Sequence, residues 1–229
     1  YAKSNLTFVQ GFIEKLADAE IEQESMDVVI SNCVVNLSPD KPAVLREVYR
    51  ALRPGGEFYF SDVYCDRDLP THVRQHRVLW GECIAGALFI NDFVRHAKEA
   101  GFDDPRILSQ SPIDITDPDL KAVVGDASFF SVTFRLFKLP GLLHTPCEDW
   151  GQVVRYKGSI VGEEGAYRLD DRLELRAGER ALVTANTAAM LGKGGVSWLA
   201  PHFEFGDDSS DSAPLKTRCG RQCGRGSCC

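Results

Sequence analysis

Eight cysteines are the residues of this 229-residue sequence most able to do chemistry, and they fall into two groups. Four are spread through sequence of ordinary globular composition, namely Cys33, Cys65, Cys83 and Cys147. The others, Cys219, Cys223, Cys228 and Cys229, crowd the C-terminal end. Neither group has the spacing of a disulfide-stapled small domain, and a chain of this length does not need such staples. We therefore expect thiol chemistry in a reducing compartment, the cytoplasm.

The terminal group differs from a zinc ribbon, which requires paired CxxC motifs. Its last two thiols are adjacent on a glycine-rich backbone, and Arg218, Arg221 and Arg225 lie among the four cysteines. Nearby positive charge favours the thiolate form, so Cys219, Cys223, Cys228 and Cys229 could close on arsenic or another soft ion. The alternative is an unstructured terminus whose thiols have no specific role.

Other candidate groups are weaker. His72 and His76 are four residues apart on a predicted helix, but the sequence lacks the H-E-x-x-H pattern of a zinc peptidase. A net charge of −7 argues against nucleic acid as the main partner. The sequence has no run of 18 apolar residues, so we expect no membrane-spanning helix.

Cys83 stands between Glu82 and the small apolar segment Ile84-Ala85-Gly86-Ala87. A soft thiolate prefers thiophilic partners such as trivalent arsenic. A buried structural cysteine is the alternative interpretation of the same pattern.

The elements that would position these thiols begin with a short β-branched run at residues 26–35, which predicts a strand buried on both faces. Apolar residues at helical spacing follow over 43–52, and Pro54-Gly55-Gly56 ends that helix. Residues 57–62 are then a second strand, so the three segments form a βαβ unit. Ser31-Asn32-Cys33 falls at the carboxyl end of its first strand, where open α/β sheets bind ligands.

Beyond this unit, residues 70–101 are predicted to be mostly helical. After Pro105 the pattern changes to short segments with strand character and one short helix, which we place at 106–109, 128–138, 152–156, 173–183 and 187–191. The fold class is α/β, and we divide the chain into residues 1–104, a smaller α+β domain at 105–205 and a Cys-rich tail at 206–229.

The order of strand end, helix and Pro-Gly-Gly turn resembles the second half of class I S-adenosylmethionine-dependent methyltransferases. That resemblance implies a Rossmann-like fold and S-adenosylmethionine as cofactor.

A narrower resemblance, to arsenite methyltransferases, runs from about residue 1 to 138 and continues more loosely to about 205. It is carried by the segments 7–16, 31–37, Trp80-Gly81-Glu82-Cys83 with its following residues to Leu88, and Phe134-Arg135-Leu136-Phe137-Lys138. The resemblance implies that Cys83 binds trivalent arsenic. It also implies that Phe12, Ile13 and Glu14 lie near the adenine and that Asn32, Cys33 and Val34 line the cofactor site.

Two features depart from that family. The resemblance implies a further arsenic-binding cysteine in a Gly-Asp-Cys segment, but Ala127 stands at that position here. The sequence also contains no glycine-rich loop of the G-x-G-x-x-G kind. We therefore expect the N-terminal part of the methyltransferase domain to be missing and this chain alone not to turn over.

The predicted function is methyl transfer from S-adenosylmethionine to thiolate-bound trivalent arsenic, presented as a thiol complex. A thiol reductant of the glutathione or thioredoxin type is the expected partner. Two alternatives stay open, namely a non-catalytic protein that binds arsenic or soft metals on a methyltransferase scaffold, and a methyltransferase for a small organic acceptor.

Overall fold

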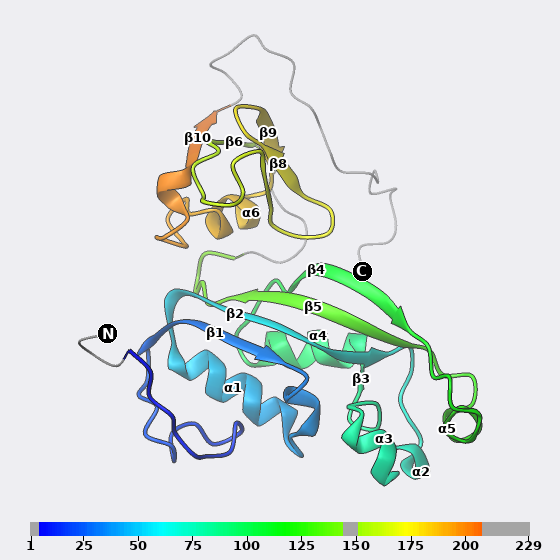
Figure 1. The fold of residues 1–229 in the computed structure, drawn as a ribbon. Helices are drawn as coiled ribbons and strands as arrows, with labels where there is room; N and C mark the ends of the chain where they lie inside the picture. The colour runs from blue at the N-terminus through cyan, green and yellow to red at the C-terminus, as the bar shows by residue number, and fades with distance from the viewer. Residues whose placement is uncertain (1–4, 144–150, 208–229) are drawn as a thin grey trace.

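The computed structural model describes residues 5–143 and 151–207. Its main sheet has the strand order β1-β2-β5-β4 (Figure 1) and is built from β1 (Met26–Asn32), β2 (Leu52–Cys65), β4 (Arg106–Ile113) and β5 (Phe129–Phe137). β1 runs parallel to β2, whereas β5 is antiparallel to both of its neighbours. The two-residue strand β3 (Leu88–Phe89) pairs with the end of β2.

Two helices, α1 (Lys41–Ala51) and α4 (Ile90–Glu99), cover one face of this sheet (Figure 1). α1 connects β1 to β2, so the predicted βαβ unit is confirmed. Its apolar stripe is buried against the sheet, as the helical spacing of Val44, Leu45 and Val48 requires.

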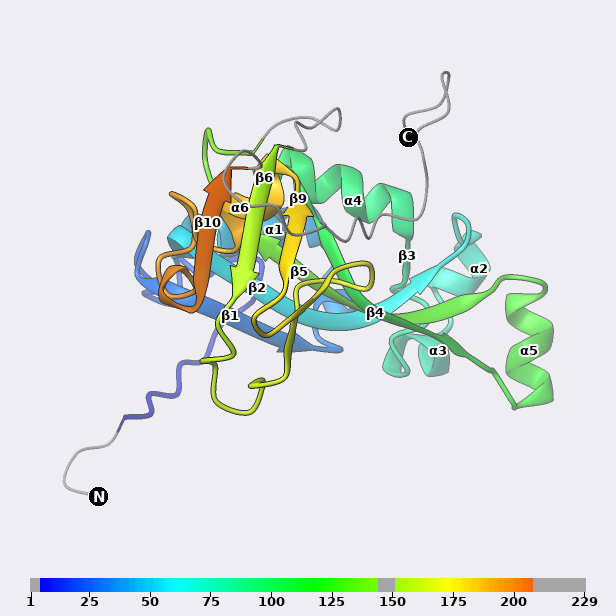
Figure 2. The same cartoon turned by 90° about the horizontal axis from the view of Figure 1, so that it is seen from above.

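Short elements lie beyond the ends of the long strands (Figure 2), namely α2 (Thr71–Arg74), α3 (Arg77–Gly81) and α5 (Pro118–Val124), and η1 (Val35–Leu37) follows β1. The segment 70–101 is thus three helices with a turn and β3 between them, rather than one mainly helical stretch. The breaks produce the turn that carries Cys83.

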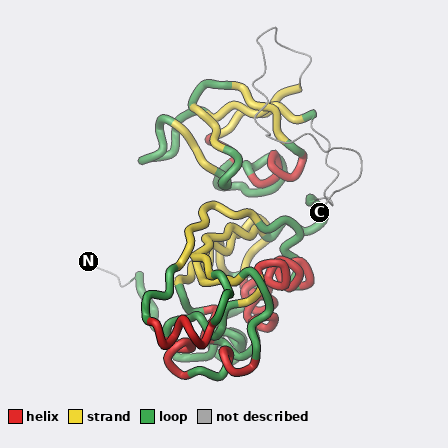
Figure 3. The backbone as a smooth tube through the Cα atoms, turned by 90° about the vertical axis from the view of Figure 1, so that its right-hand side faces the viewer, coloured by secondary structure: helices red, strands yellow, loops and turns green. Residues whose placement is uncertain are grey.

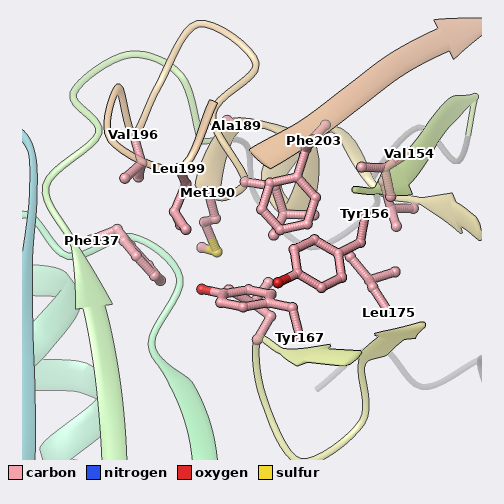
Figure 4. Close-up of a cluster of buried hydrophobic side chains, with 14 of the residues drawn as sticks. Phe137, Val154, Tyr156, Tyr167, Leu175, Ala189, Met190, Val196, Leu199 and Phe203 are labelled. Atoms are coloured by element: carbon pink, nitrogen blue, oxygen red, sulfur yellow. The ribbon is translucent and has the colours of Figure 1, made fainter. Parts of the chain in front are cut away.

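A second, smaller part lies over the opposite face of the sheet (Figures 1 and 3). It contains the antiparallel sheet β10-β6-β9, from β6 (Gln152–Tyr156), β9 (Arg180–Val183) and β10 (Phe203–Asp207). The hairpin of β7 (Ala166–Arg168) and β8 (Glu174–Arg176), the helix α6 (Ala185–Met190) and η2 (Ala200–His202) complete it. It has its own core, in which Tyr156, Tyr167 and Phe203 pack together with ring centroids 5.2–5.9 Å apart (Figure 4).

The structure divides the chain differently from the predicted boundary at residue 105. β4 and β5 follow that boundary, yet both belong to the main sheet, since β5 pairs with β2 along nine residue pairs. This pairing could not be predicted from the sequence, because the pairing of two strands that are far apart in the chain leaves no local pattern of residues. Residues 173–183 likewise form two strands, β8 and β9, separated by a turn at Gly178 with φ +78°.

The prediction that β1 is buried on both faces is wrong for the described residues. Val28 and Ile30 are 47% and 77% exposed, because β1 is an edge strand of the sheet and nothing described covers these side chains. They line a cavity of about 660 Å³ between the sheet and the smaller part, together with Tyr59, Tyr167 and Trp198.

Within residues 5–143 and 151–207, no helix is both long enough and apolar enough to cross a membrane. The Cys-rich tail predicted at 206–229 lies outside the described residues from position 208 onward, and so does Cys147.

Candidate functional site

Cys33 directly follows the last residue of β1. Its backbone N–H donates to the carbonyl of Ser61 at 2.9 Å, which extends the pairing of β1 with β2 by one bond. The residue then adopts φ +54°, a left-handed conformation that non-glycine residues rarely occupy, and its side chain is exposed. Such backbone strain is typical of residues whose placement serves function.

Cys83 lies in the turn after α3 and also has a left-handed backbone, with φ +61°. Its N–H donates to the carbonyl of Trp80 at 3.1 Å, and only 7% of the residue is exposed. The thiol points at the first cysteine, since Sγ of Cys83 donates to the carbonyl oxygen of Cys33 at 3.2 Å. The Cys33 thiol also contributes to the raised pKa of Cys83.

The environment of the pair keeps both thiols protonated at neutral pH. Burial raises the pKa of Cys83 to about 11, and the carboxylate of Asp62 adds to the effect. Burial and Asp62 also raise the pKa of Cys33. Binding a thiophilic ligand must therefore displace the thiol protons.

Asp62 and Asn36 form a buried polar layer beneath the pair. Asp62 is 1% exposed and lies on β2, one residue after the partner of Asn32, and Asn36 is 3% exposed within η1. Burial raises the pKa of Asp62, while its hydrogen bonds from the backbone N–H groups of Val63 and Asn36 oppose that rise. Neither residue has a role predicted from the sequence; Asp62 ends the second predicted strand and Asn36 directly follows the first.

The residues predicted to hold the cofactor lie along the same edge. Glu14 is fixed close to η1, because its Oε2 accepts a hydrogen bond from the Ser38 hydroxyl at 2.9 Å. Phe12 is 71% exposed and Val34 41%, while Ile13 is partly buried against the main core. Asn32 accepts a hydrogen bond from the Cys33 thiol at 3.7 Å through its side-chain oxygen.

These residues suit the adenine end of S-adenosylmethionine. Open apolar side chains such as Phe12 and Val34 offer a surface for a flat ring, and the carboxylate of Glu14 offers a hydrogen-bond acceptor. Val34 follows the carboxyl end of β1, where open α/β sheets bind ligands, and Glu14 bonds to Ser38 in the connection from that end to α1.

Cys65 is not part of the pair. It is fully buried, and its thiol donates to the carbonyl oxygens of Arg67 and Ala87 at 2.9 and 3.6 Å. Burial raises the pKa of this thiol to about 11, which fits an unreactive structural cysteine. Ala127 packs against the same apolar cluster as Cys65 and Cys83 but supplies no ligand atom.

The two predicted histidines serve local structure. Nδ1 of His76 accepts a hydrogen bond from the N–H of Leu79 at 3.4 Å and so caps α3, while Nε2 of His72 contacts the carbonyl of Val123 at 3.2 Å. No cluster of three or more His, Cys, Asp or Glu side chains arranged to hold a metal ion occurs among the residues that the structure describes. The thiol pair is therefore the site with the clearest chemistry.

Comparison with known proteins agrees with this geometry. A family model described as a methyltransferase domain matches residues 1–110. The crystal structure of an arsenic(III) S-adenosylmethionine methyltransferase from Chlamydomonas reinhardtii is 53% identical, with a TM-score of 0.85, and the match covers 94% of this chain and 71% of that one. The chain belongs to the arsenite methyltransferase family.

Curated relatives carry the same name. The arsenite methyltransferase of Aquipseudomonas alcaligenes is 50% identical over 217 residues, which are 95% of this chain and 62% of the relative. The mouse arsenite methyltransferase is 46% identical, over 92% of this chain and 54% of the relative. The chain thus spans less than two thirds of the length of these two family members, and the fold and family predicted from its sequence are confirmed.

Proposed function

We propose that this protein is an arsenite methyltransferase, in which Cys33 and Cys83 hold trivalent arsenic for methylation by S-adenosylmethionine. The observation that supports the proposal most strongly is the hydrogen bond from the Cys83 thiol to the backbone carbonyl of Cys33 at 3.2 Å, which brings together two cysteines that are 50 residues apart in the sequence. A pair of sulfur ligands suits a soft, thiophilic ion far better than the hard cations that prefer oxygen. The match to family members named for this activity supports the same substrate.

We retain the predicted role of Cys83 as an arsenic ligand and propose Cys33 as the second ligand. The resemblance implies only that Cys33 lines the cofactor site. It also implies a further arsenic-binding cysteine at the position where Ala127 stands. In the structure the Cys83 thiol donates to the main-chain carbonyl of Cys33 at 3.2 Å. We infer that a two-thiol site remains here, with the third position left to a thiol from elsewhere, such as the reductant.

Binding follows from ordinary thiol exchange. Each thiol gives its proton to the oxygen or sulfur ligand that leaves arsenic, so two As–S bonds form and two protonated ligands depart. The raised pKa of Cys83 means that this proton is still present at neutral pH. When bound, S-adenosylmethionine supplies an electrophilic methyl group for the lone pair that trivalent arsenic keeps.

The contribution of this chain is then mainly positioning. Cys33 lies between the arsenic-binding turn and the residues proposed for the cofactor, Asn32 and Val34, so one strand end serves both partners. Holding two reactants in place is worth several powers of ten in rate. A thiol reductant of the glutathione or thioredoxin type would keep Cys33 and Cys83 reduced, and this requirement favours the cytoplasm.

The proposal is tested with full-length chain and phenylarsine oxide, which releases water as it binds two thiols. In the background protein, Cys147 and the four tail cysteines are replaced by serine, so that Cys33, Cys65 and Cys83 remain. We expect one equivalent to bind, and Cys33→Ser or Cys83→Ser to weaken binding by at least about tenfold because one of two As–S bonds is lost.

Cys65→Ser is the matched control, since it removes a buried thiol outside the pair and should leave affinity unchanged. Equal affinity in Cys83→Ser and the background protein would contradict the assignment.

A further inference from the structure

Asn36 is the buried amide that connects the two cysteine turns. Its Nδ2 donates to the carbonyl of Val63 at 2.5 Å and to the carbonyl of Cys83 at 3.4 Å. Its backbone N–H donates to Oδ2 of Asp62 at 3.0 Å. One residue therefore contacts the end of β2 and the Cys83 turn, and it lies three positions after Cys33.

The same residue packs tightly against the segment that follows Cys83. A Cβ atom built on Gly86 would lie 2.1 Å from the carbonyl oxygen of Asn36, far inside contact distance. Only glycine lets the backbone of this turn approach Asn36 so closely. The close approach at Gly86 and the hydrogen bond to the Cys83 carbonyl both fix the position of the same turn relative to Asn36.

Asp62 fixes Asn36 in turn. The carboxylate accepts hydrogen bonds from Asn36 and from Val63, and it is itself almost completely buried. A buried amide whose donors are used in this way is costly to disturb, because each freed carbonyl would lose its partner without gaining water.

We propose that Asn36 is a positioning residue that holds the Cys83 turn against Cys33, so that one trivalent arsenical can bind both thiols. This inference rests on the proposed function for its ligand, but the spacing of the thiols can be measured without arsenic. Asn36 itself touches neither sulfur through its amide and acts through the main chain of Cys83.

The test uses dibromobimane, which becomes strongly fluorescent only after both of its bromomethyl groups have alkylated thiols. Each alkylation forms one C–S bond and releases bromide and a proton. The full chain with Cys147, Cys219, Cys223, Cys228 and Cys229 replaced by serine is the background, and peptide mass spectrometry locates the cross-link. We expect efficient cross-linking of Cys33 to Cys83.

Asn36→Ala should lower the cross-linked yield at least about fivefold while single alkylation continues, because the turns separate and the advantage of proximity is lost. Asn186→Ala is the matched control, since Asn186 is also a buried asparagine but bonds to Asp104 in another part of the molecule. Both variants are compared at the same interval below their own melting temperatures. A general loss of stability would therefore affect both equally.

Gly86→Ala tests the same contact from the opposite side and decides the outcome if Asn36→Ala does not fold. An undiminished Cys33–Cys83 cross-link in a folded Asn36 or Gly86 variant would overturn the inference. Phenylarsine oxide affinity, expected to fall about tenfold in Asn36→Ala, separates the two hypotheses. If the background protein cross-links but binds no arsenical, the proposed function fails while the positioning role of Asn36 stands.

Discussion

At the residue scale, the two site cysteines share an uncommon backbone. Both adopt positive φ, which costs a non-glycine residue of order 1 kcal/mol or more. Hydrogen bonds from their own N–H groups hold them there, to the carbonyl of Ser61 at the first turn and to that of Trp80 at the second. The strained turns bring the Cys83 thiol to the main chain of Cys33, from a distant segment of the sequence.

The raised thiol pKa predicts a specific pH profile for alkylation of Cys83 by iodoacetamide. Only the thiolate reacts, and the pKa is about 11 in the folded chain against 9.0 for a free thiol. At pH 8 we expect folded Cys83 to react about a hundredfold more slowly than in urea-unfolded chain, and its rate to rise about tenfold per pH unit up to pH 10.

Peptide mass spectrometry after timed quenching gives the rate at each cysteine separately. A plateau near pH 9 in the folded protein would show that the thiol is not perturbed. The raised pKa also makes the free energy of unfolding depend on pH, because a raised thiol pKa favours the folded state below pH 9. That contribution is lost as the pH rises through 11.

At the element scale, the site depends on the β1–α1–β2 unit and on how its helix begins. The carboxylate of Asp40 accepts a hydrogen bond from the N–H of Ala43 at 2.9 Å and so caps α1. This cap comes three residues after η1, and the Lys41 ammonium donates to the carbonyl of Ser38 at 3.1 Å in the same connection. The start of α1 therefore limits the path that the chain can take from Cys33 into the helix.

Asp40→Ala should lower the free energy of unfolding by about 1 kcal/mol, since it leaves a helix N–H without its acceptor. Asp40→Asn keeps an acceptor oxygen and should cost only a few tenths of that. Urea unfolding followed by circular dichroism measures both variants. Equal losses for alanine and asparagine would show that charge, and not the cap, is the stabilising feature.

At the scale of the whole molecule, Arg135 connects the main sheet to the smaller part, since it forms a buried ion pair within the sheet and a hydrogen bond to Tyr167. Arg135 on β5 donates to both carboxylate oxygens of Glu57 on β2, at 2.6 and 3.0 Å, and to the hydroxyl of Tyr167 on β7 at 2.9 Å. Both charged side chains are less than 10% exposed. Arg106 and Asp170 form a second link at 3.1 Å.

Glu57→Gln should destabilise the fold by about 3–5 kcal/mol, because it leaves the Arg135 charge buried without a counter-charge. Arg95→Ala is the control, since its ion pair with Glu99 is half exposed and should contribute no more than about 0.5 kcal/mol. Denaturant titration monitored by tryptophan fluorescence compares them. Similar small losses for both variants would mean that the Arg135 contact is not a structural link.

The sequence by itself determined the βαβ unit and the family, because these depend on local periodicity and on contiguous motifs, whereas the role of Cys83 stays a prediction. Helical spacing over 43–52 is a short-range signal, and the structure confirms that helix as α1. The helix ends at Ala51, however, and the Pro54-Gly55-Gly56 segment predicted to end it lies within β2. The exposure of Val28 and Ile30 could not be predicted in the same way, since it depends on which neighbours cover an edge strand.

Only the tertiary structure decided which thiols meet. No sequence pattern pairs Cys33 with Cys83, yet the Cys83 thiol bonds to the main chain of Cys33, whereas the buried Cys65 thiol donates to the carbonyls of Arg67 and Ala87. Strand pairing and two left-handed turns bring Cys33 and Cys83 together. Asn36 joins those turns by hydrogen bonds to the carbonyls of Val63 and Cys83, which are 27 and 47 residues away in the sequence. Long-range packing of this kind has no local periodicity, so the pair that defines the site emerged only from the fold.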